Sequence, residues 1–209
     1  DPKKMTAKEL GEIMVGQSLF QPKRPDATNK NDRVLSVKLN EVKPDTQFGV
    51  TLKNIDLEVN KSEILGIGGV AGNGQEELMQ ILTGEKIDQS ASIKYMSDDI
   101  EMLNPRERRE KGLAFAPEER LGHAAVANLN LLENSLLTDP KKRFQNKMGF
   151  INFDELNVYT NEIIEKFNVK TTSPSALASS LSGGNLQKFV VGREIGQKPS
   201  LFIVNQPTW

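Results

Sequence analysis

Residues 63–84 of this 209-residue chain read EILGIGGVAGNGQEELMQILTG. The segment 63–67 is mostly apolar and predicts a short buried strand that runs into glycines. Apolar residues at helical spacing follow from Leu78 to Leu82, and Gly84 is a typical helix end. A strand, a glycine loop and a helix in this order are the layout of a phosphate-binding loop, so we expect an α/β fold.

The flanking sequence extends this core on both sides. Alternating apolar residues predict strands over 34–42 and 50–59, and apolar runs predict strands at 113–116 and 201–204. Asn104-Pro105 is a typical helix start. Between about 118 and 180 the pattern becomes helical, which predicts a helical lobe inserted in the α/β core.

The N-terminal part has a different character. Thr6 followed by Glu9 predicts a capping box at the start of a short helix over 6–15. Residues 17–32 contain two prolines and mostly polar residues, which is typical of a linker. A new domain is therefore expected to begin near Arg33.

Composition excludes several classes of protein. The chain is 37% hydrophobic and 26% charged with a net charge of -1, so no basic field indicates a nucleic-acid partner. It contains no cysteine, which excludes a disulfide framework and a thiolate metal site. No apolar stretch approaches the length that spans a bilayer, so a role at a membrane is expected to depend on a partner.

The glycine loop departs from the phosphate-binding pattern G-x-x-x-x-G-K-[ST]. Gly69 and Gly74 match, but Gln75 stands at the lysine position and Glu76 at the position of the magnesium-binding hydroxyl. A carboxylate about 4 Å from a phosphate repels it by about 4 kcal/mol at an effective dielectric constant of about 20. The Glu76 carboxylate suits Mg²⁺ as a ligand, so we expect nucleotide binding that is weakened and not abolished.

Two other interpretations of the same loop stay open. Gly66, Gly68 and Ala71 fit a dinucleotide fingerprint, with Asp88 as the acidic residue further along, and predict a standalone nucleotide- or dinucleotide-binding module. Alternatively, the glycines form a turn between a strand and a helix that binds nothing.

A second glycine-rich segment lies upstream of the last strand, at Leu181-Ser182-Gly183-Gly184-Asn185. A serine and two glycines at the start of a helix leave backbone N–H groups unobstructed, where the helix dipole favours an anion. The alternative is that Ser182 only caps the helix that follows.

In this order, the glycine loop, Pro117-Glu118-Glu119-Arg120, the segment 181–185 and the strand that ends in Asn205-Gln206-Pro207-Thr208 resemble one family. The chain resembles the second nucleotide-binding domain of tandem ABC importer ATPases of the simple-sugar and purine-nucleoside branch. The resemblance implies a P-loop NTPase-like core sheet with an antiparallel β subdomain and an inserted helical subdomain at about 118–180. It makes residues 1–16 the tail of a preceding nucleotide-binding domain, 17–32 a linker and 33–209 most of the second domain.

The resemblance also assigns roles to individual positions. Glu118 occupies the Q-loop position, Phe48 is a candidate for stacking on adenine or else a core aromatic, and residues 181–185 are the signature. Asn205 replaces the Walker B aspartate and Gln206 the catalytic glutamate, so no catalytic residue is intact. The Walker A loop comprises Gly69, Val70, Ala71, Gly72, Asn73, Gly74, Gln75, Glu76 and Glu77.

These roles imply a division of labour between two domains. ATP and Mg²⁺ would bind weakly or not at all in this half, while the signature would complete the ATP site of the first domain of the same chain or of a dimer mate. The implied partners are transmembrane permease subunits and, indirectly, a solute-binding protein, and the implied location is the cytoplasmic face of the cell membrane. The solute is a nucleoside or a simple sugar, and the loop sequence favours nucleosides.

Overall fold

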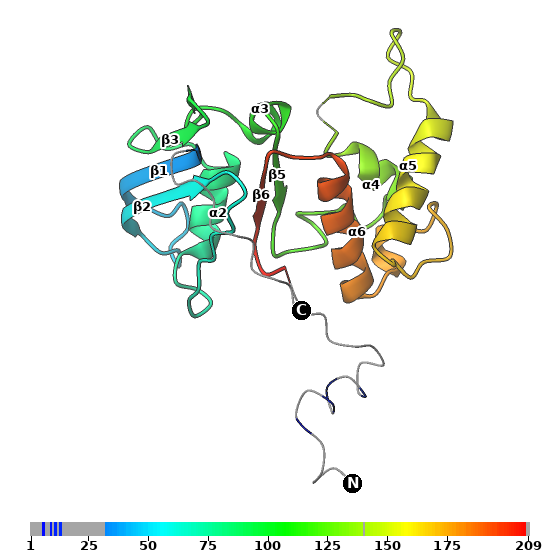
Figure 1. Ribbon diagram of the computed structural model, residues 1–209, viewed down its shortest axis with the longest axis horizontal. Helices are drawn as coiled ribbons and strands as arrows, with labels where there is room; N and C mark the ends of the chain where they lie inside the picture. Colours follow the sequence, from blue (N-terminus) through cyan, green and yellow to red (C-terminus); the bar gives the residue numbers. More distant parts are fainter. Residues whose placement is uncertain are drawn as a thin grey trace.

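The computed structural model describes residues 6, 9, 11, 13, 32–139 and 141–207. In Figure 1 the antiparallel sheet and helix α2 lie at the left of the molecule, and helices α4, α5 and α6 lie at the right. Strands β5 and β6 lie between these two parts. Nearly all of the segments predicted as a domain tail and a linker lie outside the described residues. Thr6 and Glu9 are described and form the predicted capping box. The Thr6 N–H donates to the Glu9 carboxylate at 2.7 Å, and the Glu9 N–H donates to the Thr6 hydroxyl at 3.3 Å.

The antiparallel sheet contains four strands in the order β2-β1-β3-β4. Strand β1 pairs with β2 along nearly its whole length and with β3 through residues 35–38. Alternation of the β1 sequence buries Leu35, Val37 and Leu39 on one face, as the apolar pattern predicts. The bounds of the strands are Arg33–Val42 for β1, Leu52–Asn60 for β2, Ser92–Tyr95 for β3 and Asp98–Asp99 for β4.

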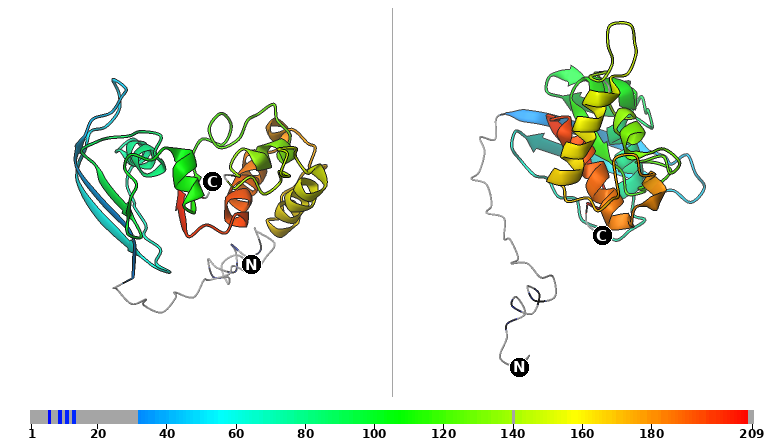
Figure 2. Two further views of the ribbon diagram at one scale, coloured as in Figure 1. Left: turned by 90° about the horizontal axis from the view of Figure 1, so that it is seen from above. Right: turned by 90° about the vertical axis from the view of Figure 1, so that its right-hand side faces the viewer.

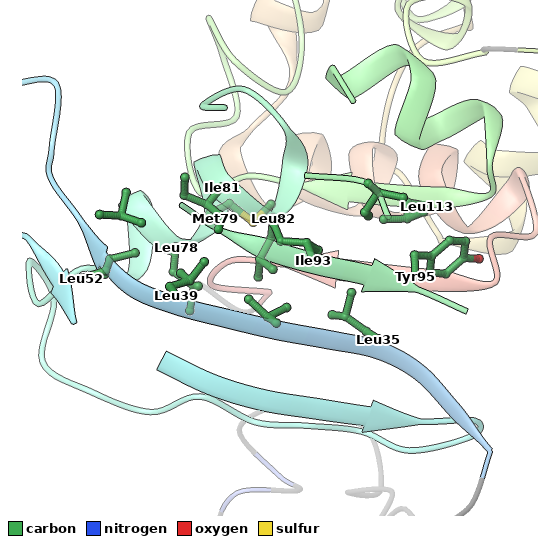
Figure 3. Packing of buried hydrophobic residues seen from close by; sticks show 14 of the residues in the cluster. Leu35, Leu39, Leu52, Leu78, Met79, Ile81, Leu82, Ile93, Tyr95 and Leu113 are labelled. Carbon is green, nitrogen blue, oxygen red and sulfur yellow. The ribbon is translucent and has the colours of Figure 1, made fainter. Parts of the chain in front are cut away.

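Helix α2 (Gln75–Thr83) covers the apolar face of this sheet. Figure 3 shows its Leu78, Met79 and Leu82 gathered against side chains of β1 and β3. Gly74 and Gly84 flank the helix in the left-handed conformation, with φ of 98° and 81°, and a Cβ at Gly74 would lie 2.8 Å from a Leu52 methyl group. The helix therefore begins and ends where the glycine pattern predicts.

The central part consists of helix α3 (Pro105–Glu110) and the parallel pair β5 (Leu113–Ala116) and β6 (Leu201–Val204). All of β5 is buried, as is typical of a strand covered on both faces. The strands pair in register, with Leu113 opposite Leu201 and Ala116 opposite Val204. The carboxyl ends of both strands therefore lie at the same edge, which places residues 117–118 beside residues 205–206.

Figure 2 shows the helical lobe, coloured from yellow-green to orange, at the end of the molecule away from the antiparallel sheet. The lobe has its own apolar core, which includes Leu131, Ile163, Leu186 and Phe189. Its first helix begins at Leu131, and residues 117–130 form turns, later than the predicted start near 118. The lobe comprises α4 (Leu131–Leu136), α5 (Phe153–Lys166), the 3₁₀ helix η2 (Ala178–Ser180) and α6 (Gly183–Gly196).

The predicted strand at 63–67 is wrong. Residues 63–70 have no regular structure, and the Ile64 and Ile67 side chains are 88% and 55% exposed. A strand requires a neighbour for its N–H and C=O groups, and none of the strand pairs in the described part of the chain includes this segment. The glycine loop therefore follows an exposed extended segment and not a buried strand.

A buried ion network fixes helix α6 to the rest of the molecule. The Glu194 carboxylate, fully buried, pairs with Arg193 at 2.9 Å and also with Arg109 of α3. The Arg193 guanidinium also donates to the carbonyls of Asn134 (3.0 Å) and Ala124 (2.8 Å), and burial lowers the pKa of this group. Charge pairing and four hydrogen bonds compensate the desolvation of these groups.

Candidate functional site

A hollow of about 790 Å³ lies between the glycine loop and the end of β6. It brings together residues that are far apart in the sequence, because α2 and β6 are neighbours at this edge. The predicted site residues that line it are Phe48, Gly69, Ala71, Gly72, Gly74, Gln75, Glu76, Glu77, Glu118, Asn205 and Gln206. The structure therefore brings these residues together around one hollow, whereas Val70 and Asn73 of the predicted loop are not among its lining residues.

Phe48 lies at the rim of this hollow with 94% of its surface exposed. The alternative that it is a core aromatic is wrong, because no apolar cluster covers its ring. An exposed aromatic face beside a hollow is suited to stacking against a planar ring. The Glu77 carboxylate accepts a hydrogen bond from the Val50 N–H at 2.8 Å and so ties the loop that carries Phe48 to helix α2.

The glycine loop is closed by the side chain of Gln75. The Gln75 Oε1 accepts a hydrogen bond from the Asn73 N–H at 3.0 Å, and its Nε2 donates to the Val70 carbonyl at 3.0 Å. A Cβ at Gly69 would lie 2.7 Å from the same Nε2, so the amide fills the space beside that glycine. A donor that a phosphate would need, the Asn73 N–H, is thus already paired within the loop.

The end of β6 presents amide side chains. The Asn205 N–H continues the ladder by donating to the Ala116 carbonyl at 2.9 Å, and Gln206 follows with a positive φ of 47°. Neither amide accepts a proton near neutral pH, so neither can act as a general base. Glu76 is exposed at the mouth, and among the residues that the structure describes no cluster of three or more acidic or histidine side chains could hold a metal ion.

A second groove, of about 620 Å³, runs from this hollow to the segment 181–185. Asn205, Glu76 and Glu118 line both cavities, whereas Leu181 and Gly183 line only the groove. The groove also contains His123, whose Nε2 lies 2.8 Å from a carboxylate oxygen of Glu85.

Ser182 occupies the N-cap position of α6, but its side chain makes no capping hydrogen bond. The interpretation that its hydroxyl only caps the helix is therefore wrong for this structure. The Ser182 hydroxyl oxygen instead accepts a hydrogen bond from the Asn185 Nδ2 at 2.9 Å. The backbone of Ser182, Gly183 and Gly184 is exposed.

The two glycines of this segment have different surroundings. A Cβ at Gly183 would lie 2.7 Å from a guanidinium nitrogen of Arg120, whereas a Cβ at Gly184 would meet nothing within 4 Å. The Arg120 cation thus lies beside the helix N-terminus, although the two are distant in sequence. Sequence reasoning did not assign Arg120 or the Asn185 contact, because such pairs are set by the tertiary fold.

Asp88, the acidic residue of the dinucleotide interpretation, does not lie at the glycine loop. The Asp88 carboxylate accepts hydrogen bonds from the Ser90 N–H at 2.8 Å and the Ser90 hydroxyl at 2.6 Å, and these bonds lower its pKa. Asp88 therefore stabilises a turn, and it is not among the residues that line the hollow beside the glycine loop.

Several curated proteins resemble nearly the whole chain. The nucleoside import ATP-binding protein NupA of Lactococcus lactis is 37% identical over 97% of this chain and 40% of that protein. The guanosine import ATP-binding protein NupO of Bacillus subtilis is 34% identical, over 96% and 39% of the two chains. The ribose import ATP-binding protein RbsA of Clostridium tetani is 31% identical, over 99% and 39%. The chain thus spans about two fifths of the length of these relatives.

Solved structures match the fold. A dimeric ATP-binding cassette bound to ADP and phosphate superposes with a TM-score of 0.67 at 19% identity, covering 84% of this chain and 75% of that one. A cassette of an ABC transporter in its ADP conformation gives a TM-score of 0.63 at 18% identity, covering 84% and 69%. These likenesses confirm the predicted α/β fold with an antiparallel β subdomain and helices.

The ABC transporter family model matches residues 52–209, which include the glycine loop, the segment 181–185 and strand β6. This match covers most of the chain and contains all residues that line the groove and most of those that line the hollow, although Phe48 lies before it. Together with the relatives, it shows that the chain belongs to the ATP-binding proteins of ABC transporters and is close to those that import nucleosides and sugars.

Proposed function

We propose that this chain is the non-hydrolytic half of an importer ATPase, and that it lends its signature segment, residues 181–185, to a nucleotide held by a partner domain. The observation that carries this proposal is a contrast between two glycine-rich segments. The first is closed by the Gln75 side chain, whereas Ser182, Gly183 and Gly184 of the second are exposed, with the Arg120 guanidinium beside Gly183. One half of a shared site is therefore accessible on this chain, and the other half is obstructed.

The obstructed half fits only part of a nucleotide. The exposed ring of Phe48 suits an adenine, but Gln75 occupies the loop where phosphates would bind. The donor set does not suit Mg²⁺ either, because Asn205 and Gln206 are neutral, Glu77 accepts from the Val50 N–H, and the described residues contain no group of three acidic or histidine side chains that could hold a metal ion. We infer that ATP binds this half weakly and is not hydrolysed there.

The accessible half has the features of a phosphate contact. Helix α6 is long enough to carry a dipole, its first N–H groups have no carbonyl partner within the helix, and glycines leave them open. The Ser182 hydroxyl is not consumed as a cap. A phosphate presented by a second cassette would meet these donors without any rearrangement of this chain.

We propose that the imported solute is a nucleoside. The two relatives named for nucleoside and guanosine import are 37% and 34% identical, whereas the relatives named for ribose and galactose import are 28% to 31% identical. Uptake of radiolabelled guanosine and of ribose by cells that express the complete transporter tests this assignment. Uptake of ribose without guanosine would contradict it.

We also propose the position of this domain in its assembly. Residues 1–16 would end a first nucleotide-binding domain, 17–32 would be a linker, and 33–209 would belong to the second domain, whose helical part is the lobe of α4, α5 and α6. The partners would be that first domain or a dimer mate, permease subunits and an indirectly coupled solute-binding protein, at the cytoplasmic face of the membrane. In the described part of the chain, no helix combines the length and the apolar character that a bilayer crossing requires.

The lending of the signature is tested in the full-length protein. Gly183→Asp places a carboxylate where a phosphate would approach, and Gly184→Ala adds a methyl group that meets nothing within this chain. Loss of an aligned transition-state donor typically lowers the rate by about 10²–10³, so we expect a fall of that order for Gly183→Asp. Phosphate release measures turnover, and thermal melting measures stability.

The control is Ser179→Ala, which alters an exposed serine just before the segment and should leave turnover unchanged. Because Gly184 has open space around it, its alanine variant should retain the wild-type melting temperature while turnover falls. Normal turnover in Gly183→Asp would overturn the proposal.

A further inference from the structure

We propose that Asn185 is a positioning residue that keeps the Ser182 hydroxyl proton from pointing toward its own helix, so that this proton stays available to the partner's phosphate. The inference rests on the proposed lending of the signature. It assigns to Asn185 a role that acts through Ser182 and not through direct contact with phosphate.

The polarity of the Asn185 amide is set by the backbone. The Lys170 N–H lies 2.9 Å from Asn185 Oδ1, and a backbone N–H can only donate. The atom that faces Lys170 must therefore be the amide oxygen. The other atom, which faces Ser182, is then the Nδ2 donor, so the O and N positions of this side chain are determined by its surroundings.

The effect on Ser182 follows from the single proton and the acceptor lone pairs of its hydroxyl group. Asn185 Nδ2 donates to Ser182 Oγ at 2.9 Å, so this oxygen accepts in that direction. The hydroxyl has one proton, and it cannot point along a bond in which its oxygen is the acceptor. The proton is therefore available to an acceptor outside the protein, and an anionic oxygen is the strongest acceptor of this kind.

Helices elsewhere in the chain show that this arrangement is not ordinary capping. Asn104, Asn130 and Asn152 each cap their helix by accepting from the backbone N–H three residues on. Ser182 makes no such bond, although it holds the same position in α6. The side-chain donor that reaches it comes from the helix that it would otherwise cap.

The support for Asn185 is itself held in place. Val169, next to Lys170, is buried in the core of the helical lobe, and the Lys188 ammonium donates to the Asn168 carbonyl at 3.2 Å. These contacts hold residues 168 and 169, directly before Lys170, against the helical lobe. The chain of hydrogen bonds from the Lys170 N–H through Asn185 to Ser182 therefore starts at an anchored backbone group.

The test uses the full-length protein and two substitutions of similar size. Asn185→Leu removes the donor, so the Ser182 proton regains the one staggered position of three that this bond excludes, and the kcat for ATP should fall by roughly 1.5-fold. Asn185→Asp keeps an acceptor for Lys170 but presents a second oxygen to Ser182, which reverses the bond. Its kcat should fall further than that of Ser182→Ala, because the hydroxyl proton is captured and a negative charge is added.

The decisive measurement is a double-mutant cycle. If Asn185 acts through Ser182, Asn185→Leu should lower kcat only when Ser182 is present, with KM for ATP and the melting temperature unchanged. Asn161→Leu is the matched control, since Asn161 is an asparagine of α5 whose amide bonds only within its own helix, to Asn157.

The outcomes separate this inference from the proposed function. An equal fractional effect of Asn185→Leu with and without Ser182, or no effect while Gly183→Asp loses turnover, would overturn the positioning role alone. Normal turnover in Gly183→Asp would overturn the shared site and this role with it.

Discussion

The Gln75 amide donates a hydrogen bond to the Val70 carbonyl at 3.0 Å and so spans the glycine loop in which both residues lie. The oxygen of the same Gln75 amide accepts a hydrogen bond from the Asn73 N–H. The position that carries a lysine in the phosphate-binding pattern therefore contributes to closing the loop, in addition to lacking a positive charge.

The loop should regain affinity for nucleotide when this contact is replaced. We expect the double variant Gln75→Lys, Glu76→Thr to bind Mg-ATP more tightly, because it removes the internal amide, adds a cation and removes a repelling carboxylate. Titration calorimetry measures the affinity. Hydrolysis should not return, because Gln206 still provides no base and binding alone does not lower the barrier.

Two further measurements sharpen this prediction. Gln75→Ala opens the loop without adding charge, so it should raise the affinity by less than the double variant. Phosphate release by the double variant, in a full-length protein whose other site is disabled, would contradict the assignment of Gln206.

The unmodified chain should bind Mg-ATP weakly and show no hydrolysis above background. The reasons are the closed loop and the neutral side chains at 205 and 206. Calorimetry on the purified chain, followed by a phosphate-release assay, tests both statements. A sub-micromolar dissociation constant or measurable turnover would show that the site is more complete than we propose.

Phe48 provides a separate test of the hollow. Its ring is 94% exposed, so Phe48→Ala should change the free energy of unfolding by no more than about 0.5 kcal/mol. If the ring stacks on adenine, the variant should bind a fluorescent ATP analogue more weakly. Phe150→Ala, at another exposed phenylalanine that does not line the hollow, should leave this binding unchanged.

The buried carboxylate of Glu194 should be critical for stability. Glu194→Gln preserves the shape but leaves the Arg193 and Arg109 cations without their anion, and loss of one partner of a buried pair typically costs about 3–5 kcal/mol. Urea unfolding measures the loss. Glu162→Gln, at an exposed position of α5, is the control, and equal effects of the two substitutions would refute the role of the network.

Local signals predicted the elements whose ends are encoded nearby. Gly74 and Gly84 bound α2, and Asn104-Pro105 starts α3 with a complete capping box, because caps depend on residues within one turn. The strand at 63–67 was predicted wrongly because a ladder depends on a distant neighbour and apolar character alone does not provide one.

The candidate site shows the same division. The order of motifs identified the residues that line the hollow, but not the orientation of their side chains. The fold of Gln75 back onto Val70 and the contact of Asn185 with Lys170 depend on rotamers and on tertiary packing, which leave no period in the sequence. The exposure of Phe48 could not be predicted from the sequence either, because phenylalanine also occurs in buried cores.

The connection between α6 and β6 has a mechanical consequence. Only residues 197–200 join the two elements, and this joint is fastened by the Gln197 amide to Thr138 at 3.0 Å and by the Ser200 N–H to the Gly112 carbonyl at 2.9 Å. These two bonds hold the joint against the segments that follow α4 and precede β5, so the end of α6 and the start of β6 keep one fixed position relative to the central strands.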